Sequence, residues 1–244
     1  MEISLAAEKI FEIGGLPVTN SMILSWIVTI LVVLTVIIST RHLQTVPSGI
    51  QNVLEFILES LLNLCNSVIE NREQTKKCFP FIATIFLFVM LNNWMGLLPG
   101  IGPIGIYEIH HGEIILVPLF RSGNADLNTA LALAIITMIA VQLFAISAIG
   151  ISKHIKKFFD FRGPINFFVG ILELISEFAK IISFSFRLFG NIFAGEVLLI
   201  VVAFLMPLIA PLPFLLLELF VGFIQALVFA MLALVFIKGA TLAH

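Results

Sequence analysis

Charged residues are scarce in this chain. Only 11% of its 244 residues are Asp, Glu, Lys or Arg, whereas 60% are hydrophobic, and the mean hydropathy is +1.13. A soluble domain of this length carries about a quarter charged residues and less than half apolar ones. The polar surface is therefore too small to cover a water-soluble globule, and the excess apolar area requires lipid around it.

Basic charge and cysteine are scarce as well. The formal net charge is −2, so no basic field is present to hold nucleic acid. The two cysteines, Cys65 and Cys78, are too few for a disulfide framework, and neither belongs to a cluster with metal-ligand spacing. We therefore expect no nucleic-acid partner, no bound metal and no cofactor, and we interpret both thiols as structural.

Long apolar segments alternate with shorter polar ones, and a helix needs about 20 apolar residues to cross a bilayer. We predict an all-α integral membrane protein, a single membrane domain over residues 1–244 with about five transmembrane helices. The predicted crossings are residues 21–40, 79–98, 127–151, 165–206 and 214–238. The segments between them are an N-terminal segment (1–20), an outer loop (99–126) and a basic cytoplasmic loop (152–164).

Residues 48–72 follow a different pattern. Apolar residues recur there at steps of three and four, whereas Gln51, Glu55, Glu59 and other polar residues occupy the opposite side. This spacing is typical of an amphipathic helix. Few basic residues lie on its polar face, so its attraction to lipid headgroups is weak, and we favour packing against another helix over a position on the membrane surface.

The segment 165–206 contains no proline and is unusually long. One continuous helix of this length would measure about 60 Å, twice the thickness of the hydrocarbon core. Such a helix must tilt steeply, bend, or lie along the membrane plane. The turn at residues 207–213 and the helix at 214–238 then complete a long tilted helical hairpin.

Lysine and arginine are distributed unevenly between the two predicted sides. One side carries only Lys9 and Arg121, and the other carries Arg41, Arg72, Lys76, Lys77, Lys153, Lys156, Lys157, Arg162 and Lys238. The positive-inside rule then predicts an outside N-terminus and a cytoplasmic C-terminus. The acidic N-terminal segment is unlike a signal peptide, so we expect the first apolar helix to be retained. These features favour a bacterial plasma membrane, although an organelle-encoded protein would look similar.

A polar stripe runs along the predicted helix 165–206. At 100° per residue, seven residues lie within about 40° of one direction; they are Glu173, Ser176, Lys180, Ser183, Arg187, Asn191 and Ala194. An arginine at membrane depth costs at least about 2.5–3.5 kcal/mol and does not escape by deprotonation. Arg187 is therefore expected to face a carboxylate or a water-filled cavity, and that carboxylate belongs either to this chain, fixing its packing, or to another chain.

Proton-exchanging groups flank Arg187 on both sides. Glu196 follows it by nine residues, about 13 Å along the helix axis, and Glu173 precedes it by about 21 Å. Glu218 and Gln225 share one face of the last helix, and antiparallel counting from the turn puts both near the depth of Glu196. This order is what two offset half-channels, separated by a fixed positive charge, would require.

Three segments resemble a known family. Arg187-Leu188-Phe189-Gly190-Asn191, followed by Ala194-Gly195-Glu196, resembles the signature of subunit a of F-type (rotary) ATP synthases, bacterial type. Asn93-Trp94-Met95-Gly96-Leu97-Leu98-Pro99 and Asp126-Leu127-Asn128-Thr129 are similar to further family segments. The resemblance implies a proton-channel subunit in the membrane sector, which packs its hairpin against a rotating ring of c subunits. It further implies contact with the b-subunit peripheral stalk and the rest of the ATP synthase.

The resemblance also implies roles for individual residues. Arg187 would face the ring carboxylates with Asn191 and Gln225 nearby, while Glu196 and Glu218 would line the outer access path. Some family members carry histidine at the position of Glu218, so the sharing of charge between the two carboxyl groups stays open. Asp126 and Asn128 either line that path or, in the case of Asp126, cap the next helix.

Two other classes of membrane protein remain as alternatives. A secondary transporter with an arginine-bound anionic substrate would show inverted repeats and broken helices, and we find no repeat in this sequence. A non-conducting anchor of a respiratory complex would use Arg187 for packing alone. The chain is not expected to be an enzyme itself, because it has no glycine-rich phosphate-binding loop and nucleotide chemistry would reside in other subunits.

Overall fold

The computed structural model describes residues 7–41, 49–98, 105–110, 113–158, 163–207 and 209–242. Six helices in these ranges are long and apolar enough to cross a membrane. The prediction of an all-α membrane protein is therefore confirmed. The helices are α1 (Asn20–Arg41), α2 (Ile50–Ile69), α3 (Arg72–Gly96), α4 (Leu127–Ile149), α5 (Ile151–Phe158), α6 (Pro164–Leu205) and α7 (Pro211–Leu242), with a short 3₁₀ helix η1 (Gly123–Ala125) before α4.

The sequence did not predict two antiparallel β-hairpins. The first joins β1 (Lys9–Ile13) to β2 (Leu16–Thr19), and the second joins β3 (Gly105–His110) to β4 (Glu113–Pro118). Both lie in segments expected to be irregular, so they add local order without changing the helical class.

Two helices differ in extent from the predicted segments, and a third was not predicted. α3 begins at Arg72, ahead of the predicted start at residue 79, because the Asn71 side chain accepts hydrogen bonds from the backbone amides of Glu73 and Gln74. α5 occupies most of the described part of the basic loop. α7 begins at Pro211 within the predicted turn, since proline is compatible with the first turn of a helix.

The amphipathic helix α2 packs against other helices. Its buried residues Leu61, Cys65 and Ile69 belong to the same hydrophobic core as α3 and α7. At its C-terminal end, Lys238 Nζ of α7 donates a hydrogen bond to the Val68 carbonyl oxygen at 2.6 Å. α2 also meets the length and hydropathy criteria for a crossing, so six helices qualify where five crossings were expected.

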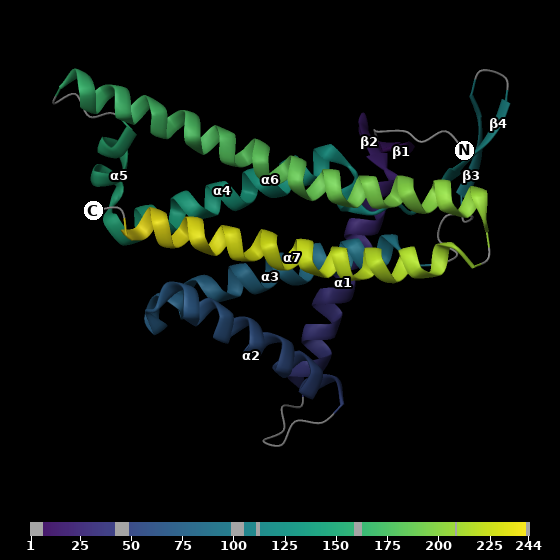
Figure 1. Ribbon diagram of the computed structural model, residues 1–244, viewed down its shortest axis with the longest axis horizontal. Helices are drawn as coiled ribbons and strands as arrows, with labels where there is room; N and C mark the ends of the chain where they lie inside the picture. The colour runs from purple at the N-terminus through teal and green to yellow at the C-terminus, as the bar shows by residue number, and fades with distance from the viewer. Residues whose placement is uncertain are drawn as a thin grey trace.

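α6 and α7 form an antiparallel hairpin along the longest axis of the molecule (Figure 1). α4 packs on both of them and α3 packs mainly on α7. Small residues of α4 and α7 are fully buried in these interfaces, which allows the helix backbones to approach closely; they are Ala130, Ala134, Ala226, Ala230 and Ala233. Large side chains fill the remaining space, as in the edge-to-face pair Phe184–Phe229, whose ring centroids are 4.6 Å apart.

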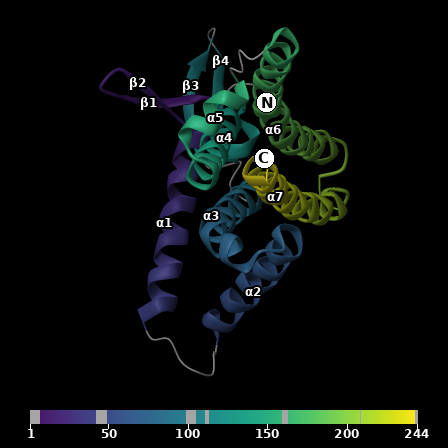
Figure 2. The same ribbon diagram turned by 90° about the vertical axis from the view of Figure 1, so that its left-hand side faces the viewer.

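Helix length and direction support a tilted hairpin. α6 has 42 residues and measures about 63 Å, whereas the 22 residues of α1 measure about 33 Å, close to the hydrocarbon thickness. In both views α1 runs across the direction of α6 and α7 (Figures 1 and 2). If α1 stands along the membrane normal, the hairpin must therefore lie strongly tilted.

Asparagine side chains join α3, η1 and α7. Asn93 Nδ2 donates to the Gly222 carbonyl oxygen at 2.9 Å, and Asn93 Oδ1 accepts from Asn124 Nδ2 at 2.6 Å. Trp94 Nε1 adds a bond to the Leu219 carbonyl oxygen at 3.0 Å. Because Asn93 and Asn124 are fully buried, these bonds fix how the segment before α4 sits against the hairpin.

We predict that Asn93→Leu destabilises the protein by about 1–3 kcal/mol, the usual cost of leaving a buried polar group without its partner. The thermal unfolding midpoint of the detergent-solubilised protein measures this effect. Asn52→Leu makes the same change at an exposed position of α2 and should leave the midpoint nearly unchanged. Equal midpoints for the two variants would contradict the bridging role of Asn93.

Candidate functional site

Two cavities lie along α6. The first, about 240 Å³, is bounded by α3, α6, α7 and the segment between β4 and η1, and both Glu196 and Glu218 line it. The second, about 250 Å³, lies between α6 and α7, and Lys180 and Arg187 line it. Acidic side chains thus belong to one cavity and basic side chains of α6 to the other.

The first cavity brings together the two glutamates that the sequence singled out. Glu218 is only 7% exposed and has no hydrogen-bond partner within the described residues. Its carboxyl group lies against Gly195 of α6, where a Cβ atom would overlap the carboxyl atoms. Glycine at this position therefore makes the space that lets the α7 carboxyl group reach α6 beside Glu196.

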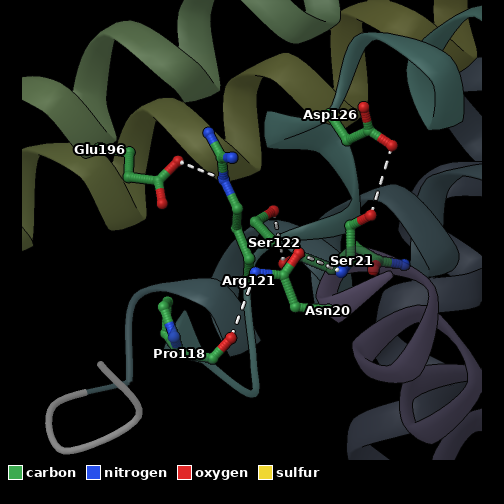
Figure 3. Close-up of polar contacts among 8 residues, drawn as sticks. Asn20, Ser21, Pro118, Arg121, Ser122, Asp126 and Glu196 are labelled. Carbon is green, nitrogen blue, oxygen red and sulfur yellow. Dashed lines mark hydrogen bonds and ion pairs between the residues drawn. The ribbon is translucent and has the colours of Figure 1, made fainter. Parts of the chain in front are cut away.

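Arg121 also lines the first cavity, although from the sequence it was expected only as a charge on the outer side. Arg121 Nε donates to Glu196 Oε2 at 3.2 Å, and its side chain is 8% exposed, against 34% for Glu196 (Figure 3). The guanidinium also lies over the Phe193 ring, 5.9 Å from the centroid. A lone arginine in an outer loop that has no other Lys or Arg is the signal that could have suggested a partner.

Arg187 lies in the second cavity with its charge unbalanced. Its side chain is exposed, and Nη2 donates to Ser183 Oγ at 3.4 Å. Within the described ranges no carboxylate forms an ion pair with it. An exposed, permanently charged group on a membrane helix implies that something outside this chain, water or another protein, surrounds it.

Lys180, in the same cavity, has its charge balanced. Its Nζ pairs with Glu177 Oε1 at 2.7 Å, and Glu177 Oε2 accepts from Gln142 Nε2 of α4 at 2.8 Å. Glu177 lies off the polar stripe and was not among the residues singled out from the sequence. Glu177 lies off the stripe because its side chain contacts α4. Since Glu177 pairs with Lys180, Arg187 is the cation of this cavity that has no paired carboxylate in the described chain.

Asn191 and Gln225 connect the two helices one turn beyond Arg187. Asn191 Nδ2 donates to Gln225 Oε1 at 2.7 Å. Asn191 is exposed, whereas Gln225 is 4% exposed, and its Nε2 has no partner in the described part of the chain. This hydrogen bond therefore joins a residue on the α6 surface to a buried residue in the α6–α7 interface.

Three other residues singled out from the sequence line neither cavity. Asp126 caps α4, since Oδ1 accepts from the Asn128 amide at 3.2 Å and Oδ2 accepts from Thr129 Oγ1 and Ser21 Oγ (Figure 3). Asn128 is exposed at the start of α4, and Glu173 is half-buried on α6 beyond Ser176. The structure thus gives Asp126 a structural function whether or not it also lines an access path.

A comparison with family models gives a match over most of the chain. The model of the family described as ATP synthase A chain matches residues 22–238. The matched range contains both cavities, the Arg121–Glu196 pair, all of α6 and α7 as far as Lys238. Since the match extends over far more than half of the chain, this protein belongs to the ATP synthase A chain family.

Proposed function

We propose that this chain is the proton-channel subunit of the membrane sector of an F-type ATP synthase. In this proposal it forms two offset half-channels beside a ring of c subunits, and Arg187 separates them. Family membership supports an ion-translocating membrane subunit of ATP synthase. The observation that carries the finer proposal is the exposed Arg187, which has no carboxylate partner in the described chain and lies about 13 Å along α6 from Glu196.

The outer half-channel uses the first cavity. A proton arrives through the region of Glu196 and Glu218 and neutralises a carboxylate of the ring. Two carboxyl groups around one cavity of about 240 Å³ are suited to this step, because each can accept and release a proton and the space can hold water. Asn128, and Asp126 near the start of α4, are candidates for the approach to this cavity.

Arg187 acts at the step where the ring carboxylate must give up its proton. A guanidinium stabilises an ionised carboxylate and stays charged at every physiological pH. A ring site that reaches Arg187 therefore releases its proton rather than carrying it across. Asn191 and Gln225 hold the neighbouring surface of α6 and α7 in place through their 2.7 Å hydrogen bond.

The inner half-channel leads from the second cavity toward the cytoplasm. Ser176 and Ser183 supply hydroxyl groups there, and Glu173 lies farther along the same helix. Each proton that crosses a potential of 100 mV releases about 2.3 kcal/mol, so several must pass per turn to drive ATP formation. The chain provides the path, and nucleotide chemistry belongs to other subunits.

The proposed orientation has the N-terminus outside and the C-terminus in the cytoplasm of a bacterial plasma membrane. Support comes from the ends of the hairpin. The C-terminal end of α7 lies near the basic helix α5, whereas the β3–β4 hairpin lies at the opposite end, near the α6–α7 turn (Figure 1). Gln74 Nε2, in the basic first turns of α3, also bonds Thr241 Oγ1 at 2.7 Å. The proposed partners are the c ring, which faces Arg187, and the b-subunit stalk.

The first test replaces the arginine. We expect Arg187→Ala to abolish both ATP-driven proton pumping and respiration-driven ATP synthesis in membrane vesicles while the complex remains assembled. The reason is that the ring carboxylate loses the charge that makes it release its proton. Arg41→Ala removes an exposed arginine at the end of α1 and serves as the control. Normal synthesis by an assembled Arg187→Ala complex would favour a packing role for the arginine.

The second test moves Glu218 without changing its chemistry. In the Gly195→Ala variant the new methyl group must displace the Glu218 carboxyl group, so we expect pumping to fall about 10-fold or more, as misplaced reacting groups commonly do. Gly239→Ala adds a methyl group on α7 where nothing lies within 4 Å and should pump normally. Equal pumping rates in the two assembled variants would exclude Glu218 from the proton path.

A further inference from the structure

We infer that Arg121 is a positioning residue of the outer half-channel, which holds the Glu196 carboxylate at the cavity shared with Glu218. The inference rests on the proposed function, because it assigns the loop before η1 a part in the same proton path. Its basis is the 3.2 Å contact between Arg121 Nε and Glu196 Oε2, which joins positions 75 residues apart in the chain.

Burial makes this contact informative. Arg121 is more than nine-tenths buried, and a buried guanidinium is costly unless it is paired and hydrogen-bonded. Glu196 is one-third exposed, so the same carboxylate faces both the arginine and open space. One oxygen can therefore be held by Arg121 while the other remains accessible to water and protons.

The loop that carries Arg121 is itself fixed to the helices. On one side, Asn20 Nδ2 of α1 donates to the Pro118 carbonyl oxygen at 3.2 Å (Figure 3). On the other side, Ser122 Oγ donates to the Asn92 carbonyl oxygen at 3.1 Å, and a Cβ atom at Gly96 would overlap Ser122. Because the backbone is fixed on both sides of Arg121, its guanidinium can hold Glu196 in one position.

The charge of Arg121 acts on Glu196 and not on Glu218. Arg121, Glu196 and Glu218 are the ionisable side chains that line the cavity in the described structure. The two carboxyl groups repel each other when both are ionised. Arg121 forms an ion pair with Glu196, whereas Glu218 has no hydrogen-bond or ion-pair partner in the described chain. A guanidinium has hydrogen-bond donors and no acceptor atom, so Arg121 acts on the proton path through Glu196.

A packing role is the competing explanation. The guanidinium covers the Phe193 ring and fills space beside it, and other long side chains can fill that space in part. The two roles differ in what a substitution must preserve. Positioning requires the charge, whereas packing requires the volume.

The experiment compares Arg121→Lys with Arg121→Gln in the assembled ATP synthase, with ATP-driven proton pumping in inverted vesicles as the readout. We expect Arg121→Gln to lower the pumping rate about 10-fold, as expected for a misplaced reacting group, and Arg121→Lys to keep most of the rate. Arg41→Gln makes the same substitution at an exposed arginine at the end of α1 and should stay near the wild-type rate.

Either of two outcomes would overturn the inference: a wild-type rate for Arg121→Gln, or equal losses for Arg121→Lys and Arg121→Gln. If Arg121→Gln does not assemble, the double variant Arg121→Gln with Glu196→Gln decides. Assembly of the double variant would show that the single variant fails because Glu196 lost its partner, whereas failure of both would assign Arg121 to packing and overturn the inference.

Arg187→Ala, measured in parallel, separates this inference from the proposed function. If Arg187→Ala abolishes pumping and Arg121→Gln pumps normally, only the role of Arg121 is wrong. If Arg187→Ala pumps normally in an assembled complex, the proposed channel mechanism fails and the inference fails with it.

Discussion

A positive charge in the apolar part of this protein must be balanced or solvated, and this constraint governs the contacts made along the hairpin. Lys180 meets it through Glu177, and Arg121 meets it through Glu196. The charge of Arg187 is not balanced within the described chain, although placing an arginine at membrane depth costs free energy. The described chain thus neutralises Lys180 and Arg121 and leaves Arg187 exposed, so water or another protein must surround the charge of Arg187. In the proposed mechanism the partner of Arg187 is a carboxylate of the ring.

The length of α6 determines how far apart the two cavities lie. Its 42 residues do not fit across a bilayer along the normal, so the helix must run obliquely, and positions along it differ in lateral place as well as in depth. The cavity at Glu196 and the cavity at Arg187 are thereby offset along the hairpin. Antiparallel pairing with α7 gives the first cavity its second carboxyl group and gives Asn191 its contact with Gln225.

Features with a local signature could be predicted from the sequence. The polar stripe from Ser176 to Arg187 follows from helical periodicity alone, and four of its residues line one cavity. Antiparallel counting from the turn also anticipated that Glu218 lies close to Glu196, because an antiparallel pair of straight helices leaves little freedom in register. The absence of proline from residues 165–206 also predicted one long helix, and α6 has 42 residues.

Contacts between distant segments had no such signature. The sequence contains no pattern that links Arg121 to Glu196 or Gln142 to Glu177, since each pair joins separate elements whose packing is decided by the whole bundle. The β-hairpins and α5 were also missed, because short elements between crossings carry weak periodicity. Asp126 shows the opposite case, in which a cap just before a helix was one of two open interpretations and its bonds are now observed.

The two arginines illustrate how one chemical group serves different purposes according to its surroundings. Arg121 is enclosed by its own chain, so its charge is already used in holding Glu196 and has little attraction left for a passing carboxylate. Arg187 differs in exposure and in the absence of an ion pair among the described residues, so its full charge is available to a group that approaches from outside. If both arginines lacked an ion pair, each would stabilise an ionised ring carboxylate. The arginine at the outer cavity would then oppose protonation of the ring carboxylate there. Arg121 is paired with Glu196, whereas Arg187 has no ion pair in the described chain, so the electrostatic potential differs between the two cavities. In the proposed mechanism this difference allows the ring carboxylate to take up a proton at the first cavity and to release it at the second.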